Sequence, residues 1–124
     1  MRKIFLSLII FLSACSNVVP ESSLVGNYVA NYGNETATLS LKADRTYAHA
    51  IRVNGAHIAD DAGPWTQMVS SGRTVVEFSD FRVVPSYRER RREKGGWATE
   101  VEWTWLGRLQ LCFDSDLGYC YVKQ

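Results

Sequence analysis

The strict alternation of two kinds of side chain is the feature that most restricts the fold of this 124-residue chain. It is clearest in residues 97–105 (WATEVEWTW), where Trp97, Trp103 and Trp105 share one face and two glutamates lie on the other. A period of two residues is that of a β-strand with one buried face. We therefore expect the face that carries the three tryptophans to be buried.

Similar short segments follow one another between turn residues, and no run of twelve residues has the 3.6-residue period of a helix. Residues 54–64 carry Asn-Gly and Gly-Pro at their ends and are predicted to form a loop. About eight strands joined in sequence predict an all-β fold, an antiparallel up-and-down meander that forms a small barrel or a strongly curved sheet. The predicted strands are 24–32, 35–42, 46–53, 65–70, 73–78 with an extension over 81–84, 97–105, 108–113 and 119–123.

The N-terminus has the order of a secretory signal. Arg2 and Lys3 precede a mostly apolar run over residues 4–12, and small residues follow it. Nine residues are too few to span a bilayer, which takes about 20. Loss of Arg2 and Lys3 with the signal leaves 12 basic against 13 acidic residues. This near-neutral balance argues against nucleic acid as a partner.

The end of the signal, Leu12-Ser13-Ala14-Cys15, resembles the bacterial lipobox. The resemblance implies a signal peptide over 1–14 and cleavage before Cys15, whose thiol receives the lipid that anchors the protein to a membrane. Ser16 stands where an Asp would imply retention at the inner membrane, so the resemblance implies the periplasmic face of the outer membrane. We expect a lipidated tether over 15–23 and a single β-barrel domain over 24–124.

Three further motifs lie in the first half of the mature chain. They are Gly26-Asn27-Tyr28, residues 38–47 (TLSLKADRTY) and Gly63-Pro64-Trp65. Together they resemble the G-x-Y, L-x-L-x-x-D-x-x-Y, G-x-W progression of small lipocalin-like (calycin-like) bacterial lipoproteins. The resemblance implies a barrel and says little about activity. Arg45 stands where the family often has Gly, which leaves the type of turn open.

Cys112 and Cys120 remain after Cys15 is assigned to the lipid. They flank a turn-forming stretch with Asp, Ser and Gly, so a hairpin would place them opposite one another. In that hairpin, residue 113 opposes 119 and 114 opposes 118. Because an exported protein meets an oxidising environment, we predict a disulfide between Cys112 and Cys120.

The most unusual segment is residues 85–96 (PSYRERRREKGG), which has five positive and two negative charges. One interpretation is a solvated connection between two strands. The other is a contact with an acidic partner, such as lipid headgroups, an anionic envelope polymer or an acidic patch on a protein. The candidate partner-binding residues are Arg88, Arg90, Arg91, Arg92 and Lys94.

The chain lacks the motifs of the common catalytic and metal sites. His49 is predicted on a strand face and His57 in a loop, with no ligands at the spacing of a metal site, and there is no G-x-S-x-G. We therefore expect no cofactor, no metal and no catalysis.

Two candidate functions remain. The first is a non-catalytic envelope lipoprotein that binds a protein or an anionic envelope component. The alternative is a lipocalin-like carrier of a small apolar ligand in the barrel interior.

Overall fold

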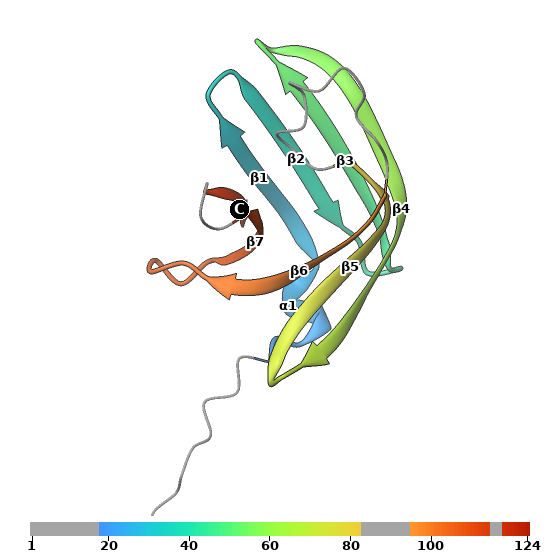
Figure 1. Cartoon of the computed structure of the whole chain (residues 1–124), viewed down its shortest axis with the longest axis vertical. Coiled ribbons are helices and arrows are strands. Elements are labelled where there is room, and N and C mark those ends of the chain that lie inside the picture. The colour runs from blue at the N-terminus through green and yellow to red at the C-terminus, as the bar shows by residue number, and fades with distance from the viewer. Residues whose placement is uncertain (1–17, 83–94, 115–117) are drawn as a thin grey trace, which may run out of the picture.

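The structure, a computed structural model, describes residues 18–82, 95–114 and 118–124. These residues form a closed eight-stranded antiparallel barrel, with a short helix before the first strand (Figure 1). The predicted all-β meander is therefore confirmed. The elements are α1 (Glu21–Leu24), β1 (Gly26–Tyr32), β2 (Glu35–Leu41), β3 (Thr46–Val53), β4 (Ala56–Ser70), β5 (Arg73–Phe81), β6 (Gly95–Trp103), β7 (Leu109–Asp114) and β8 (Tyr119–Lys123).

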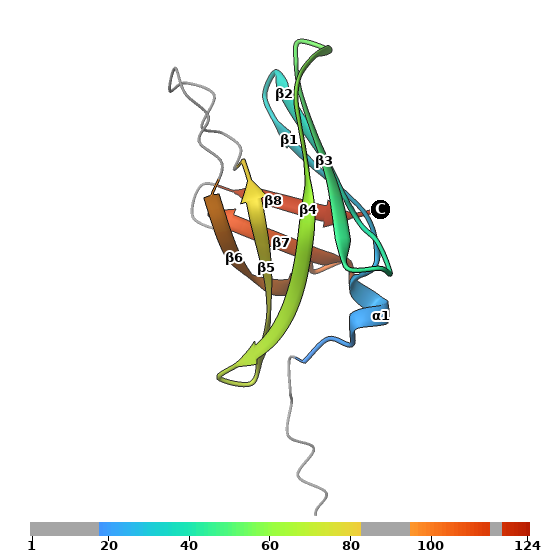
Figure 2. The same ribbon diagram turned by 90° about the vertical axis from the view of Figure 1, so that its right-hand side faces the viewer.

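Each strand pairs with the next one in sequence, and β1 pairs with β8 to close the wall. The closing register joins Tyr28 to Lys123 and Val29 to Val122. Figure 2 shows β1 to β4 running steeply and β7 and β8 running nearly across them, with β5 and the curved β6 between the two groups. Closure pairs the two strands that would otherwise be exposed edges of the sheet.

Alternate side chains of the strands fill the interior. Aromatic rings contact one another there, with ring centroids 5.3 Å apart for Tyr47 and Phe78 and 5.2 Å apart for Phe81 and Phe113. Five residues of the sequence motifs are almost completely buried, so these motifs supply the core of the barrel: Tyr28, Leu39, Leu41, Tyr47 and Trp65.

The predicted loop over residues 54–64 is wrong, because all but its first two residues belong to the 15-residue strand β4. Gly63 lies opposite Tyr47, and a Cβ at Gly63 would come within 3.3 Å of the Tyr47 ring and 3.1 Å of the Ser79 carbonyl oxygen. The glycine therefore allows close packing inside a strand. His57, predicted in the loop, is an exposed residue of β4 whose ring contacts Asp60.

The prediction that one whole face of residues 97–105 is buried is also wrong. Thr99 and Val101 are buried at its centre, but 41% of Trp97, 55% of Trp103 and 93% of Trp105 are exposed. The strand ends at Trp103, and Trp105 lies in the turn between β6 and β7. The predicted alternation of inward and outward side chains holds at the centre of the strand, but the tryptophans at its two ends lie outside the buried interior of the barrel.

The turn between β2 and β3 adopts the conformation that a glycine would favour. Arg45 has a φ of 64°, in the left-handed region. The Asp44 carboxylate accepts hydrogen bonds from the backbone N–H and the hydroxyl of Thr46, at 3.0 and 2.6 Å. The Arg45 guanidinium donates to both carboxylate oxygens of Glu21, at 2.8 and 3.1 Å, which ties this turn to α1.

The described part of the predicted tether packs against the barrel. Val19 is buried, and its N–H donates to the Thr74 hydroxyl at 2.7 Å. Leu24 is fully buried, and its carbonyl oxygen accepts a hydrogen bond of 2.6 Å from the Tyr28 hydroxyl. Ordered packing therefore begins before residue 24, the predicted start of the domain.

Candidate functional site

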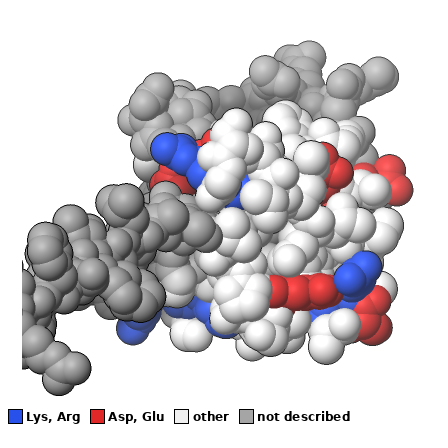
Figure 3. All heavy atoms as spheres, turned by 90° about the horizontal axis from the view of Figure 1, so that it is seen from below, with Lys and Arg blue, Asp and Glu red and all other residues white. Residues whose placement is uncertain are grey.

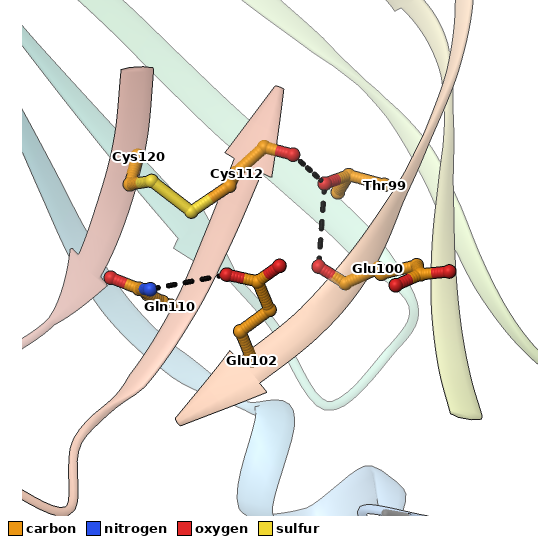
Figure 4. The surroundings of a disulfide bond; sticks show 6 residues. All are labelled: Thr99, Glu100, Glu102, Gln110, Cys112 and Cys120. Carbon is orange, nitrogen blue, oxygen red and sulfur yellow. Dashed lines mark hydrogen bonds between the residues drawn. A yellow bond between two sulfur atoms is a disulfide. The ribbon is translucent and has the colours of Figure 1, made fainter. Parts of the chain in front are cut away.

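The disulfide between Cys112 and Cys120 is confirmed. The two residues are directly paired across β7 and β8, with Cα atoms 4.0 Å apart (Figure 4). Beyond them the register shifts and Asp114 pairs with Tyr119, so the predicted pairing of 113 with 119 is wrong. The Thr99 hydroxyl of β6 donates to the Cys112 carbonyl oxygen and links the hairpin to the neighbouring strand.

Two of the predicted sites lie outside the described residues. One is the lipidation site, Cys15, and the other is the basic segment. Both stay predictions. The described residues that flank the charged part of the basic segment are Arg82, directly after β5, and Gly95, the first residue of β6. The segment itself carries the candidate residues Arg88, Arg90, Arg91, Arg92 and Lys94.

A polar cluster inside the barrel joins three strands. Nδ1 of His49 on β3 lies 3.1 Å from Oδ2 of Asp61 on β4, and Nε2 lies 2.7 Å from the hydroxyl of Tyr121 on β8. All three residues are buried. Because an ionised carboxylate only accepts, Nδ1 of His49 carries the proton that is donated to Asp61.

Arg82 provides one further donor and a positive charge to Asp61. Its backbone N–H donates to Oδ2 at 3.1 Å, and its Nε lies 3.4 Å from Oδ1. Burial raises the pKa of Asp61. Hydrogen bonds from His49 and from the Arg82 amide, and the electrostatic effects of the His49 and Arg82 side chains, lower this pKa by more than burial raises it. The net result is a pKa below the usual value for aspartate, so Asp61 is ionised at neutral pH.

This cluster uses both ring nitrogens of His49 within the barrel. The imidazole also stacks on the Phe81 ring, with centroids 4.3 Å apart. An imidazole held in this way connects β3, β4 and β8 and orients the aromatic core around it. Sequence reasoning missed the cluster because Asp61 was assigned to a loop. Asp61 continues the two-residue alternation of Ala59, Gly63 and Trp65, and this was the signal that could have found it.

Exposed apolar side chains lie on two separate turns at the rim of the barrel on the side of α1 (Figure 1). They come from the turns β4–β5 and β6–β7 and from the first described residue. We call this set the apolar end: Val18, Met68, Val69, Trp103, Trp105 and Leu106. The other exposed large hydrophobic residues in the described part of the chain, Ile58 and Trp97, lie near the starts of β4 and β6, toward the opposite end. Sequence reasoning missed this feature because it placed the tryptophans in the core.

A shallow groove of about 510 Å³ covers the outer face of β1 to β4. It is open because the outward residues there have short side chains, among them Ala48, Ala50 and Ala62. Within the described ranges, no three His, Cys, Asp or Glu side chains lie close enough to hold a metal ion. None of the helices among these residues has the length and hydrophobicity needed to cross a membrane.

Comparison of the chain with protein-family models, with curated proteins and with solved structures finds no match.

Proposed function

We propose that this chain is a non-catalytic lipoprotein of the bacterial envelope that binds a protein or an anionic envelope component. The lipid on Cys15 anchors it at the periplasmic face of the outer membrane. Its disulfide is consistent with an exported protein, because such bonds persist in oxidising compartments.

The observation that supports the binding role is that side chains fill the described interior of the barrel. The buried polar groups His49, Asp61 and Tyr121 bond to one another, and aromatic rings pack around them. These side chains occupy space that a ligand inside the barrel would need. The packed interior therefore favours contacts through the outer surface over the carriage of a small apolar ligand.

The basic segment is the proposed contact for an anionic partner. Its flanking strands are joined to one another and to the interior, since the Trp97 indole donates to the Phe81 carbonyl oxygen at 2.9 Å and Asp61 binds the Arg82 amide. Five positive charges between these fixed points provide electrostatic attraction for an acidic surface: Arg88, Arg90, Arg91, Arg92 and Lys94.

Acylation of Cys15 tests the anchor. When the full chain is expressed in a bacterium supplied with radiolabelled palmitate, we expect label in the wild type and none in Cys15→Ala, because only the thiol accepts the lipid. Cys112→Ala is the matched control and should be labelled like the wild type. Equal labelling of wild type and Cys15→Ala would contradict the proposal.

A further inference from the structure

The turn between β6 and β7 presents two large apolar side chains on a well-ordered backbone. Trp105 and Leu106 are 93% and 67% exposed. The turn is closed by hydrogen bonds from the Thr104 N–H to the Arg108 carbonyl oxygen at 2.7 Å and from the Arg108 N–H to the Thr104 hydroxyl at 3.0 Å. Clustered apolar side chains exposed on a fixed turn indicate a contact surface.

The described residues 18–24 link the surroundings of the two apolar turns. At their start, the Val19 N–H is bonded to Thr74, which pairs with Val69 beside the β4–β5 turn. Further along, the Ser23 carbonyl oxygen accepts a 2.6 Å hydrogen bond from the Lys123 ammonium group. Ser23, Lys123 and Trp103 also line one groove.

Cys15 is close to this end whatever path the chain takes. It precedes Val18 by three residues, and an extended chain covers at most about 3.6 Å per residue, so their Cα atoms lie within about 11 Å of each other. The headgroup layer of one leaflet is roughly 5–8 Å thick. An acylated Cys15 therefore keeps Val18, one member of the apolar end, close to the membrane surface.

We propose that the apolar end inserts into the interface of the phospholipid bilayer that holds the anchor, with Trp103, Trp105 and Leu106 at the depth of the headgroups and upper acyl chains. This inference rests on the proposed acylation of Cys15. It gives the barrel a fixed orientation on the membrane, in place of free movement on a lipid tether.

The chemistry of this end fits a bilayer interface. Tryptophan is enriched there because its ring is apolar and its N–H is polar. Arg108 and Lys123 line the groove next to Trp103, where they can meet lipid phosphates. Seen from below, most of the described surface is uncharged, although acidic and basic side chains also extend across its lower part (Figure 3).

Fluorescence quenching tests the insertion. The mature lipidated protein is reconstituted into phosphatidylcholine vesicles whose upper acyl-chain carbons are brominated, and bromine quenches indoles at that depth. We expect strong quenching in the wild type and loss of that quenching in Trp103→Phe/Trp105→Phe, which keeps only the buried Trp65 and the distant Trp97. The matched control is Trp97→Phe, which should be quenched like the wild type. Far-UV circular dichroism checks that each variant folds.

Failure of this inference is distinguishable from failure of the anchor. The intact mass of each preparation reports whether Cys15 is acylated, independently of fluorescence. If the acylated wild type shows no quenching, or if the double variant is quenched as strongly as the wild type, the proposed insertion is wrong although the anchor is present. So would capture of a polypeptide, and not lipid, by a photo-crosslinker attached at Leu106→Cys in native envelopes.

Discussion

At the residue scale, Asp61 carries a charge in the barrel interior, and its surroundings compensate it. An unpaired carboxylate in such a site would be protonated or would destabilise the fold. Asp61 receives hydrogen bonds from His49 and from the Arg82 amide, and the Arg82 side chain lies close by. This residue therefore connects β3 with Arg82, which directly follows β5.

Replacement of Asp61 by Asn tests this role. Because one partner of a buried charged pair is removed, we expect the free energy of unfolding at pH 7 to fall by about 3 kcal/mol. The measurement is urea denaturation. Asp60→Asn is the matched control. Its side chain is 69% exposed and bonds only to the exposed His57, so a change of no more than about 0.5 kcal/mol is expected.

The stability difference between wild type and Asp61→Asn should depend on pH in a defined direction. The pKa of Asp61 is lower in the folded than in the unfolded state, so its contribution is complete above the unfolded value of about 4 and disappears as the pH falls through the folded value. The difference in stability between wild type and Asp61→Asn should therefore shrink below about pH 4. A difference that stays constant from pH 7 to pH 3 would contradict this account.

At the scale of elements, the β7–β8 hairpin is held by the disulfide and by strand pairing. Closure of a nine-residue loop contributes roughly 2.5 kcal/mol in the chain-entropy model. We expect Cys112→Ala to lower the free energy of unfolding by about 2–3 kcal/mol without loss of the fold, because β7 also pairs with β6. Thermal and urea unfolding measure the effect. Reduction of the wild type should reproduce it, and no effect of reductant would contradict it.

The strands that could be predicted are those in which one face is apolar. In β2, and over residues 47–51 of β3, every second residue is buried, as the alternation of Ala37, Leu39 and Leu41 predicts. In β4 the inward positions include Asp61 and Gly63, residue types that break strands in isolation. Tertiary contacts determine the strand conformation there, since the Asp61 carboxylate is hydrogen-bonded to His49 and Gly63 leaves room for the Tyr47 ring.

The candidate site was predictable only where local pattern was sufficient. The disulfide follows from two cysteines around a turn. The apolar end does not, because alternation specifies which residues share a face and not where the barrel wall stops. Trp103 and Trp105 satisfy the strand pattern, yet they lie at and beyond the end of β6. Their exposure depends on the length of the neighbouring strands.

At the scale of the whole molecule, the apolar end and the described residues that flank the basic residues, Arg82 and Gly95, are at opposite ends of the barrel. The nine residues of β5 separate them by about 30 Å, at 3.3 Å per residue. With the apolar end at the membrane, the ends of β5 and β6 nearest the basic segment face away from it. A partner for this segment is then a protein or polymer outside the anchoring bilayer, and not the headgroups of that bilayer.

Charge reversal in the basic segment tests this arrangement. Arg90→Glu/Arg91→Glu/Arg92→Glu should weaken binding to the envelope fraction and reduce its dependence on salt, because exposed charges are screened over roughly 10 Å at 0.1 M. Folding should be nearly unchanged, and so should tryptophan quenching in brominated vesicles. Arg52→Glu, an exposed arginine on β3, is the control for a general effect of charge. Identical salt curves for the reversed and wild-type proteins would leave the segment as a solvated connection.

The start of β1 and the last residue of the sequence meet at the seam between β1 and β8. The Gln124 N–H donates to the Asn27 carbonyl oxygen at 2.9 Å, next to the pairing that closes the wall. A ring of strands has no intrinsic first member, so a circularly permuted chain that joins these ends and opens at Gly33 would keep the same neighbours around the wall. Its new N-terminus would lie at the opposite rim. An anchor attached there would turn that opposite rim, and not the apolar end, toward the membrane.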